Sequence, residues 1–274
     1  MTTLTGRTAL ITGGASGIGL LLGKELVRRG AGVVLWDIDE SKLQRATAEL
    51  GALSGRRCSG YLCDVGDAPA VRKAADEVLA DGSEVDIVVN NAGIVTGAPL
   101  LELPDESIEA TFRVNVLSLY WVTKAFLPGM MERRRGHVVT IASAAGLVGV
   151  ARQTDYSASK HAAVGFDESL RMELARLAPA LKTTVVCPFY VDTGMFAGVR
   201  TRFPRLLPIL RPEAVARRIA TAVEKDRRRL IMPAIVRLVP TLRSLPPPVF
   251  DKVMDAFGVN VSMDEFVGHA GPRP

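Results

Sequence analysis

A tyrosine and a lysine stand four positions apart in the segment DYSASKHA, where small residues separate Tyr156 from Lys160. On an α-helix, residues four apart lie one turn apart on the same face, so the phenol and the ammonium would point the same way. An ammonium beside a phenol favours the phenolate, which can take a proton from an alcohol. Because such a pair also occurs on many exposed helix faces, its meaning depends on the rest of the chain.

Strand-like and helix-like segments alternate along the chain as far as about residue 232. The predicted strands are apolar almost throughout, which indicates a parallel sheet with helices on both faces. We therefore expect an α/β fold, a Rossmann-type doubly wound sheet of about seven strands. The predicted strands cover 7–12, 32–37, 59–64, 85–93, 136–143, 181–188 and 229–233, and the predicted helices cover 18–29, 39–50, 68–80, 104–131, 155–177 and 211–225.

The loop TGGASGIG joins the first predicted strand to the first predicted helix and is typical of a dinucleotide site. Glycine adopts backbone angles that other residues resist, and its missing side chain lets a pyrophosphate approach the backbone. The N-terminus of the helix offers unpaired N–H groups and a positive dipole to the phosphates. Many turns are rich in glycine, but this one has the strand–loop–helix context that the site requires. The predicted contacts are Gly13, Ser16, Gly17, Ile18 and Gly19.

Two acidic residues follow the next predicted strands. Asp37 stands 18 residues after Gly19, near the spacing of about 20 for the acid that binds an adenosine ribose. A carboxylate there repels a 2′-phosphate, so it favours NAD as the cofactor over the alternative, NADP. The other interpretation of Asp37 is a helix cap, a role that suits Asp39 better. After the third strand, Asp64 and Val65 are candidates for holding the adenine edge, and an N-cap of the next helix is an equally open role for Asp64.

Together these segments resemble the short-chain dehydrogenase/reductase family over about residues 5–232. Besides TGGASGIG and Asp64, the resemblance rests on NNAG (90–93), Asn115 in VNV, Ser143 in TIASAAG and YSASK, in the family's order and spacing. Each motif alone is weak evidence, and the set is specific. The resemblance implies that Tyr156 is the general base when an alcohol is oxidised and the general acid when a carbonyl is reduced.

The resemblance also implies roles for the residues around Tyr156. A free tyrosine has a pKa of about 10, and Lys160, with the positive nicotinamide, would lower it while also binding the nicotinamide ribose. Ser143 would hydrogen-bond the substrate oxygen, and Asn115 would hold a water that relays protons to Lys160. The NNAG residues are expected to be structural and close to the cofactor, with contacts from Asn91, Ala92 and Gly93.

The run CPFYVDTGM departs from the family pattern after the sixth predicted strand. Pro188 and Thr193 are present, but Phe189 stands where the family usually has glycine. The resemblance implies that Pro188, the backbone near Val191 and the Thr193 hydroxyl hold the nicotinamide carboxamide. The bulky Phe189 and Tyr190 are expected to line the substrate side.

This run, RLIMP and the tail PPPVFDKVMDAFGVNVSMDEFVGH are similar to one branch of the family, which includes lipid-droplet hydroxysteroid dehydrogenases and NAD-dependent retinol dehydrogenases. The resemblance implies hydride transfer between NAD(H) and a small lipophilic secondary or allylic alcohol or carbonyl, steroid-like or retinoid-like. The alternatives are an NADPH-linked carbonyl reductase and a nucleotide-binding lipid-surface protein without catalysis. Branch members often have an N-terminal apolar anchor, which this sequence lacks, so we expect a cytoplasmic protein with peripheral membrane contact as an open alternative.

We expect a dinucleotide-binding and catalytic domain over residues 1–232, which includes a substrate lid at about 194–212, and a C-terminal extension over 233–274. The lid mixes apolar residues with arginines, which suits either an amphipathic helix that closes on its own core or contact with an anionic membrane. For the extension, subunit contact is preferred over lid support and membrane docking. The resemblance implies a homodimer or homotetramer formed through the helices at 104–131 and 155–177.

Composition excludes several other classes of protein. The net charge is +5, but the basic residues are scattered or stand at helix ends, so we expect no nucleic-acid partner. The three cysteines are an odd number with no metal-binding spacing, which indicates reduced thiols in a cytosol and no metal. No signal peptide is recognised, and no stretch reaches about 18 apolar residues, so no membrane-spanning helix is expected. The cysteines are Cys58, Cys63 and Cys187.

Overall fold

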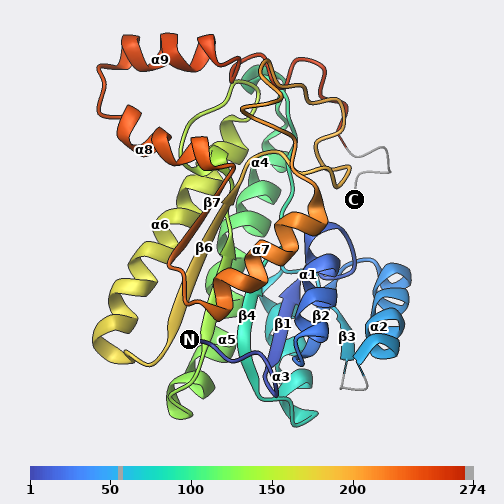
Figure 1. Ribbon diagram of the computed structural model, residues 1–274. Helices are drawn as coiled ribbons and strands as arrows, with labels where there is room; N and C mark the ends of the chain where they lie inside the picture. Colours follow the sequence, from blue (N-terminus) through green and yellow to red (C-terminus); the bar gives the residue numbers. More distant parts are fainter. Residues whose placement is uncertain (55–57, 269–274) are drawn as a thin grey trace.

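The computed structural model describes residues 1–54 and 58–268, whose strands form one parallel seven-stranded sheet in the order β3-β2-β1-β4-β5-β6-β7 (Figure 1). The predicted doubly wound α/β fold is confirmed. Because the strand order reverses between β1 and β4, a crevice forms beyond their carboxyl ends, where ligands bind in such sheets. The strands are β1 (Thr8–Thr12), β2 (Gly32–Asp37), β3 (Cys58–Leu62), β4 (Val85–Asn90), β5 (His137–Ile141), β6 (Lys182–Pro188) and β7 (Arg229–Met232).

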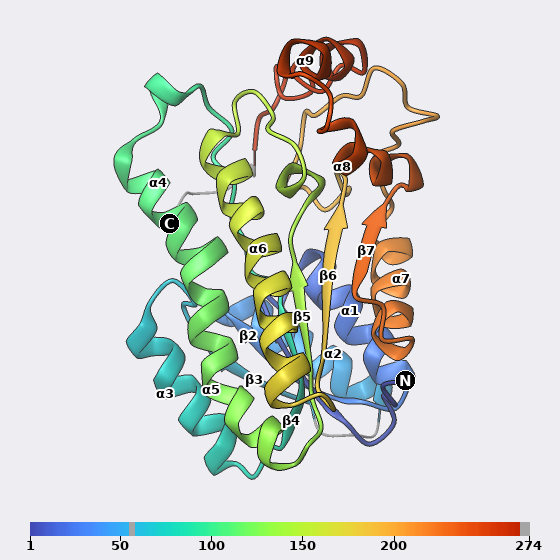
Figure 2. The same cartoon turned by 90° about the vertical axis from the view of Figure 1, so that its left-hand side faces the viewer.

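Helices cover both faces of the sheet, as the apolar strands require (Figure 2). Successive side chains of a strand point to opposite faces, so each strand contributes to two cores. Leu10 of β1 packs in one core, and Ile11 packs in the other. One face carries α1 (Gly17–Arg28), α2 (Glu40–Ser54) and α7 (Pro212–Glu224), and the other carries α3 (Ala68–Ala80), α4 (Asp105–Phe112), α5 (Ser118–Glu132) and α6 (Thr154–Leu177).

The helix expected at 104–131 is not a single regular helix. A π-helical turn at Arg113–Leu117 separates α4 from α5. Such turns are rare and are frequent at functional sites. Asn115 lies in this turn, and contacts described below explain the local distortion.

The lid consists of turns and irregular loop. It does not form the amphipathic helix that was one of the two interpretations of this segment. Gly194 and Gly198 have φ values of 86° and 87°, in a region that a right-handed helix does not use. Pro204 and Pro208 also lack the N–H that a continuing helix needs. The lid is therefore a loop held by its neighbours.

After β7, the C-terminal extension crosses the end of the sheet where β6 and β7 finish, close to the lid (Figure 1). It contains η4 (Ala234–Leu238), α8 (Val239–Leu242) and α9 (Pro247–Ala256). The extension expected over 233–274 is described as far as residue 268, and 269–274 lie outside the described residues. Among the described residues, no helix combines the length and apolar character needed to cross a bilayer.

Candidate active site

The glycine-rich loop after β1 has a shape that requires glycine. Gly13 and Gly17 have φ values of +59° and +51°, which residues with a side chain rarely adopt. A Cβ on Gly19 would lie 2.3 Å from the carbonyl oxygen of Gly13. Ser16 precedes α1 without a side-chain cap, and the first turn contains no acidic residue. The backbone N–H groups of this turn, which includes Ile18, are therefore suited to an anion such as a pyrophosphate.

The segment after β4 is fastened to this loop by Thr12. Its Oγ1 accepts hydrogen bonds from the backbone N–H groups of Asn91 and Ala92, both at 3.0 Å. In return, Asn91 Nδ2 donates to the carbonyl oxygens of Thr12 and Gly13 at 2.9 and 3.1 Å. The Asn91 side chain thus shapes the loop. This role of the Thr12 side chain was not predicted. The signal for it was a polar residue at the end of an otherwise apolar strand.

Asp37 ends β2 beside the same loop. Its two carboxylate oxygens accept hydrogen bonds from the backbone N–H groups of Ala15 at 3.0 Å and Asp39 at 3.1 Å. Each oxygen keeps a further lone pair, so ribose hydroxyls can still bind. Asp39 caps α2 by accepting from the Lys42 N–H at 3.0 Å. The capping role therefore belongs to Asp39, and Asp37 stays a candidate for the ribose.

Asp64 and Val65 follow β3 at the edge of the crevice. Asp64 Oδ1 accepts from the Gly66 N–H at 2.8 Å and so stabilises a tight turn. The next helix, α3, is capped by Asp67, whose side chain accepts from Ala70. The alternative that Asp64 is the N-cap is therefore wrong. Val65 is buried in the core, so only its backbone is left for a ligand.

Tyr156 and Lys160 lie together on α6, and both are buried. Lys160 Nζ is 5.6 Å from the centroid of the Tyr156 ring and donates a hydrogen bond to the carbonyl oxygen of Ile141 at 3.0 Å. A Cβ on Gly93 would lie 3.3 Å from that Nζ, so the NNAG backbone passes directly beside the ammonium. The sheet, the NNAG segment and α6 thus meet at Lys160.

Asn115 ties three segments together through its carboxamide. Nδ2 donates to the carbonyl oxygen of Ile94 at 2.9 Å and to Ser159 Oγ at 3.0 Å, and Oδ1 accepts from the Ile94 N–H at 2.9 Å. These bonds account for the π-helical turn, because they hold Asn115 against both α6 and the segment that follows β4. The proton-relaying water predicted for Asn115 stays a prediction.

Ser143 follows β5 and faces the same cavity as Tyr156. Its Oγ accepts a hydrogen bond from the Ala145 N–H at 3.1 Å, as the cap of η3 (Ala144–Gly146). This bond fixes the oxygen and leaves the hydroxyl proton available for another acceptor. The arrangement suits a donor to a substrate oxygen.

Burial controls the protonation of the tyrosine and the lysine. It raises the pKa of Tyr156 above its ordinary value, the neighbouring Ser143 hydroxyl offsets part of this, and Tyr190 adds to the rise. Burial also lowers the pKa of Lys160 to about 8. Without the cofactor, the phenol is therefore harder to ionise than a free tyrosine, because burial has the largest effect on its pKa. That the lysine and the positive nicotinamide together lower the pKa of Tyr156 stays a prediction.

The loop after β6 closes over the glycine-rich loop. Thr193 Cβ lies 3.6 Å from where a Cβ of Gly17 would be. Val191 forms an isolated parallel bridge with Leu210, which fixes its backbone beside the crevice. Pro188 ends β6 opposite Met232 of β7. The structure thus brings Thr193, predicted for the nicotinamide end, beside the glycine-rich loop predicted for the phosphates.

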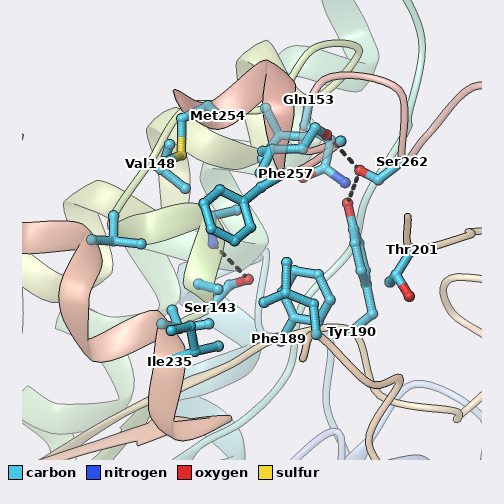
Figure 3. Close-up of a pocket in the computed structure, with 18 of the residues that line it drawn as sticks. Ser143, Val148, Gln153, Phe189, Tyr190, Thr201, Ile235, Met254, Phe257 and Ser262 are labelled. Atoms are coloured by element: carbon cyan, nitrogen blue, oxygen red, sulfur yellow. Dashed lines mark hydrogen bonds between the residues drawn. The ribbon is translucent and has the colours of Figure 1, made fainter. Parts of the chain in front are cut away.

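An apolar cavity of about 100 Å³ adjoins Ser143 and Tyr156 (Figure 3). Phe189 and Tyr190 line it, as expected. Phe196 of the lid packs edge-on against both Tyr156 and Tyr190, with ring centroids 5.8 and 5.1 Å apart. The volume is below the roughly 300–1,000 Å³ typical of ligand sites, so a bulky ligand requires the lid and the extension to move apart.

The C-terminal extension forms one side of this cavity. Its residues at η4, α8 and α9 line the same cavity as Ser143. Its Phe257 and Phe266 also pack against Phe203 and Phe196 of the lid, which is consistent with lid support. Subunit contact, the preferred alternative, stays a prediction. The extension contributes Ile235, Val236, Leu238, Val239, Leu242, Met254, Phe257, Gly258, Val259 and Ser262.

Sequence reasoning missed three polar residues of the cavity, Gln153, Thr201 and Ser262. Gln153 immediately precedes α6 as its N-cap and stands three positions before Tyr156. Its nearness to Tyr156 in the sequence was a signal for Gln153. Ser262 comes from the extension and had no such signal.

Comparison with known proteins gives a consistent result. Residues 7–203 match the family model described as short chain dehydrogenase. Epidermal retinol dehydrogenase 2 of Mus musculus is 42% identical over 97% of this chain and 86% of its own length. Short-chain dehydrogenase/reductase family 16C member 6 of Bos taurus is 40% identical over 96% of this chain and 84% of its own length. Retinol dehydrogenase 10-A of Danio rerio is 41% identical over 89% of this chain and 79% of its own length.

Solved structures agree with these relatives. A short-chain dehydrogenase/reductase from Burkholderia phymatum in complex with NAD has a TM-score of 0.79 and 28% identity, covering 89% of this chain and 95% of that one. A putative short-chain dehydrogenase from Novosphingobium aromaticivorans has a TM-score of 0.76 and 27% identity, covering 93% and 88%. The similarity thus extends over most of both chains in each comparison.

Proposed function

The chain belongs to the short-chain dehydrogenase/reductase family, and from this premise we propose that it is an NAD-dependent dehydrogenase of lipophilic secondary or allylic alcohols, steroid-like or retinoid-like. The observation that carries the proposal is the apolar cavity, whose wall holds the paired hydroxyls of Ser143 and Tyr156. The retinol dehydrogenase names of two of the relatives support a retinoid-like substrate. Carbonyl reduction by the same residues is the reverse of this reaction.

The proposed cofactor is NAD, and residues of this chain fit it. A side chain at position 19 would clash with the backbone of Gly13, so only glycine fits beside the phosphate site. The first turn of α1 contains no acidic residue that would repel the phosphates. Asp37, bonded to the N–H of Ala15 in the same loop, is placed to bind the adenosine ribose. We propose contacts from Gly13, Ser16, Gly17, Ile18, Gly19, Asp37, Asp64, Val65, Asn91, Ala92, Gly93, Tyr156, Lys160, Pro188, Val191 and Thr193. When bound, NAD supplies the acceptor for the substrate's hydride.

The chain's own residues would orient the alcohol and move its proton. Ser143 Oγ donates to the substrate oxygen and holds it against the Tyr156 phenol. The phenolate form of Tyr156 takes the hydroxyl proton as the alcohol is oxidised, and the phenol returns a proton when the carbonyl is reduced. Lys160 holds a positive charge near the ring, while Asn115 holds the NNAG loop against α6 through Ile94 and Ser159.

A panel of alcohols tests this proposal. The purified protein with NAD should produce NADH, measured by absorbance, with retinol, hydroxysteroids or long-chain secondary alkanols. Short polar alcohols should be turned over poorly because they bury little apolar area in the cavity. Silence with NAD across the panel, together with NADPH-dependent reduction of the matching carbonyls, would support the alternative of a carbonyl reductase.

Removing the charge of Asp37 should change the choice of cofactor. We expect Asp37→Asn to raise KM for NAD by about tenfold, because it weakens the acceptor of the ribose hydroxyls. It should raise kcat/KM for NADP, because the 2′-phosphate no longer meets a negative charge. Asp39→Asn is the matched control, since Asp39 caps α2. Steady-state kinetics with both cofactors measure the ratio, and an unchanged ratio in Asp37→Asn would contradict the assigned role.

The larger organisation of the protein is also part of the proposal. We propose a catalytic domain at 1–232 with the extension closing its cavity, assembled as a homodimer or homotetramer. Tyr120, which is about half exposed on α5, supports an interface at this helix. We propose a cytoplasmic location, with peripheral membrane contact through the lid as the alternative, which the exposed side chains of Phe203, Leu206 and Ile209 support.

A further inference from the structure

A polar cluster interrupts the apolar wall of the cavity. Gln153, Tyr190 and Ser262 all line it, with exposed fractions of 1%, 8% and 4%. They come from the start of α6, the loop after β6 and the extension. Figure 3 shows the Tyr190 hydroxyl pointing toward Ser262, with Gln153 beside the pair. The reaction proposed above uses none of the three.

The hydrogen bonds of the cluster fix which atoms can receive a ligand. Ser262 Oγ donates its only proton to the carbonyl oxygen of Val259 at 2.7 Å. In the 2.9 Å contact between Ser262 Oγ and the Tyr190 hydroxyl, Tyr190 is therefore the donor. The Tyr190 oxygen has given its proton and keeps its lone pairs. It can thus accept a hydrogen bond from a ligand.

Gln153 provides the complementary donor. Its amide nitrogen, Nε2, is buried and has no hydrogen-bond partner among the residues that the structure describes. Figure 3 shows the Gln153 side chain beside the Tyr190 hydroxyl, and no hydrogen bond joins the two. A buried N–H without an acceptor destabilises a protein, and a ligand that supplies the acceptor removes that cost.

We propose that Gln153 and Tyr190 form a second polar subsite, which binds a hydroxyl of the substrate remote from the hydroxyl that reacts. Gln153 Nε2 donates to the remote oxygen, and that hydroxyl donates to the Tyr190 oxygen. The inference rests on the proposed function and narrows its substrate class to lipophilic diols, because an alcohol with a plain hydrocarbon tail leaves the Gln153 donor unpaired.

Three matched sets of secondary alkanols test the subsite. One set has a plain chain, one has an ether oxygen, and one has a tertiary hydroxyl, which cannot itself be oxidised. The second oxygen is placed at successive positions along chains of constant length. At one position, we expect KM to be about tenfold lower for the diol than for the plain alkanol, with the ether between them. The kcat should change less, because the subsite binds a part of the substrate that does not react.

Variants separate the donor from the acceptor. Gln153→Met keeps the length of the side chain and removes the N–H, so the advantage of the ether over the plain alkanol should disappear. Tyr190→Phe removes the acceptor, so the diol should lose its advantage over the ether while the ether keeps its own. Leu207→Met, an apolar change in the same wall, is the control and should preserve both ratios.

Each result bears on one of the two proposals. If the parent protein oxidises plain alkanols and the second oxygen lowers KM at no position, the subsite is refuted and the proposed function stands. If the advantage appears but survives in Gln153→Met and in Tyr190→Phe, the subsite is assigned to the wrong residues and is also refuted. If no alcohol of any set is oxidised, the proposed function fails.

Discussion

Tyr156→Phe should lower kcat for alcohol oxidation by about a thousandfold, within the usual range for losing a general acid–base group. The phenylalanine ring fills the same space against Phe196, so the core and the cavity should be retained. The loss should therefore appear in kcat, while KM for NAD and the melting temperature stay close to those of the parent protein. Steady-state kinetics and thermal unfolding together measure the effect.

Tyr120→Phe is the matched control for this variant. Tyr120 is about half exposed on α5, packs against Phe166 and does not line the cavity. Removal of its hydroxyl should therefore leave kcat within about twofold of the parent. A Tyr156→Phe variant that remained fully folded and kept more than a tenth of the parent's kcat would exclude Tyr156 as the proton acceptor.

Lys160→Met should lower kcat by roughly a hundredfold near neutral pH and move the rising limb of the pH profile upward. A charge 5.6 Å from the phenol ring stabilises a phenolate by about 3 kcal/mol at an effective dielectric constant of about 20. That energy corresponds to roughly two orders of magnitude in the phenolate fraction. Without the ammonium, phenolate forms only at higher pH, so the variant should recover part of its activity as pH rises.

The measurement is kcat as a function of pH with saturating NAD. The parent should gain activity as the pH rises towards about 8, and the gain should level off above that pH. Burial lowers the pKa of Lys160 to about 8, so at higher pH the lysine loses the charge that favours the phenolate. Lys24→Met, which removes a lysine paired with Glu49 on the surface, is the control. If Lys160→Met lowered kcat equally at every pH, the lysine would act by position rather than by charge.

The sheet and its helices were predictable because each strand is a short apolar run with both faces buried, as Leu10 and Ile11 illustrate. The positions of Tyr156 and Lys160 were predictable for a related reason, since helical spacing alone sets their relative direction. The glycine-rich loop was predictable from the demands of a phosphate on the backbone. These are all local properties of the chain.

Features that depend on distant residues were not predictable. The π-helical turn at Asn115 depends on Ile94, and the sequence pattern of 104–131 looks like ordinary helix. The Tyr190–Ser262 bond joins residues 72 positions apart. The sign of the pKa change at Tyr156 depends on how completely the fold buries the phenol, which no spacing shows.

The proposed mechanism depends on a charge balance at Tyr156. Burial opposes the phenolate, and two cations, Lys160 and the nicotinamide of bound NAD, are proposed to favour it. An ultraviolet difference titration of the parent protein against Tyr156→Phe, with and without saturating NAD, measures this balance directly. We expect no phenolate from Tyr156 below a pH of about 10 without NAD, and one with a clearly lower midpoint when NAD is bound. An equal midpoint with and without NAD would contradict the account.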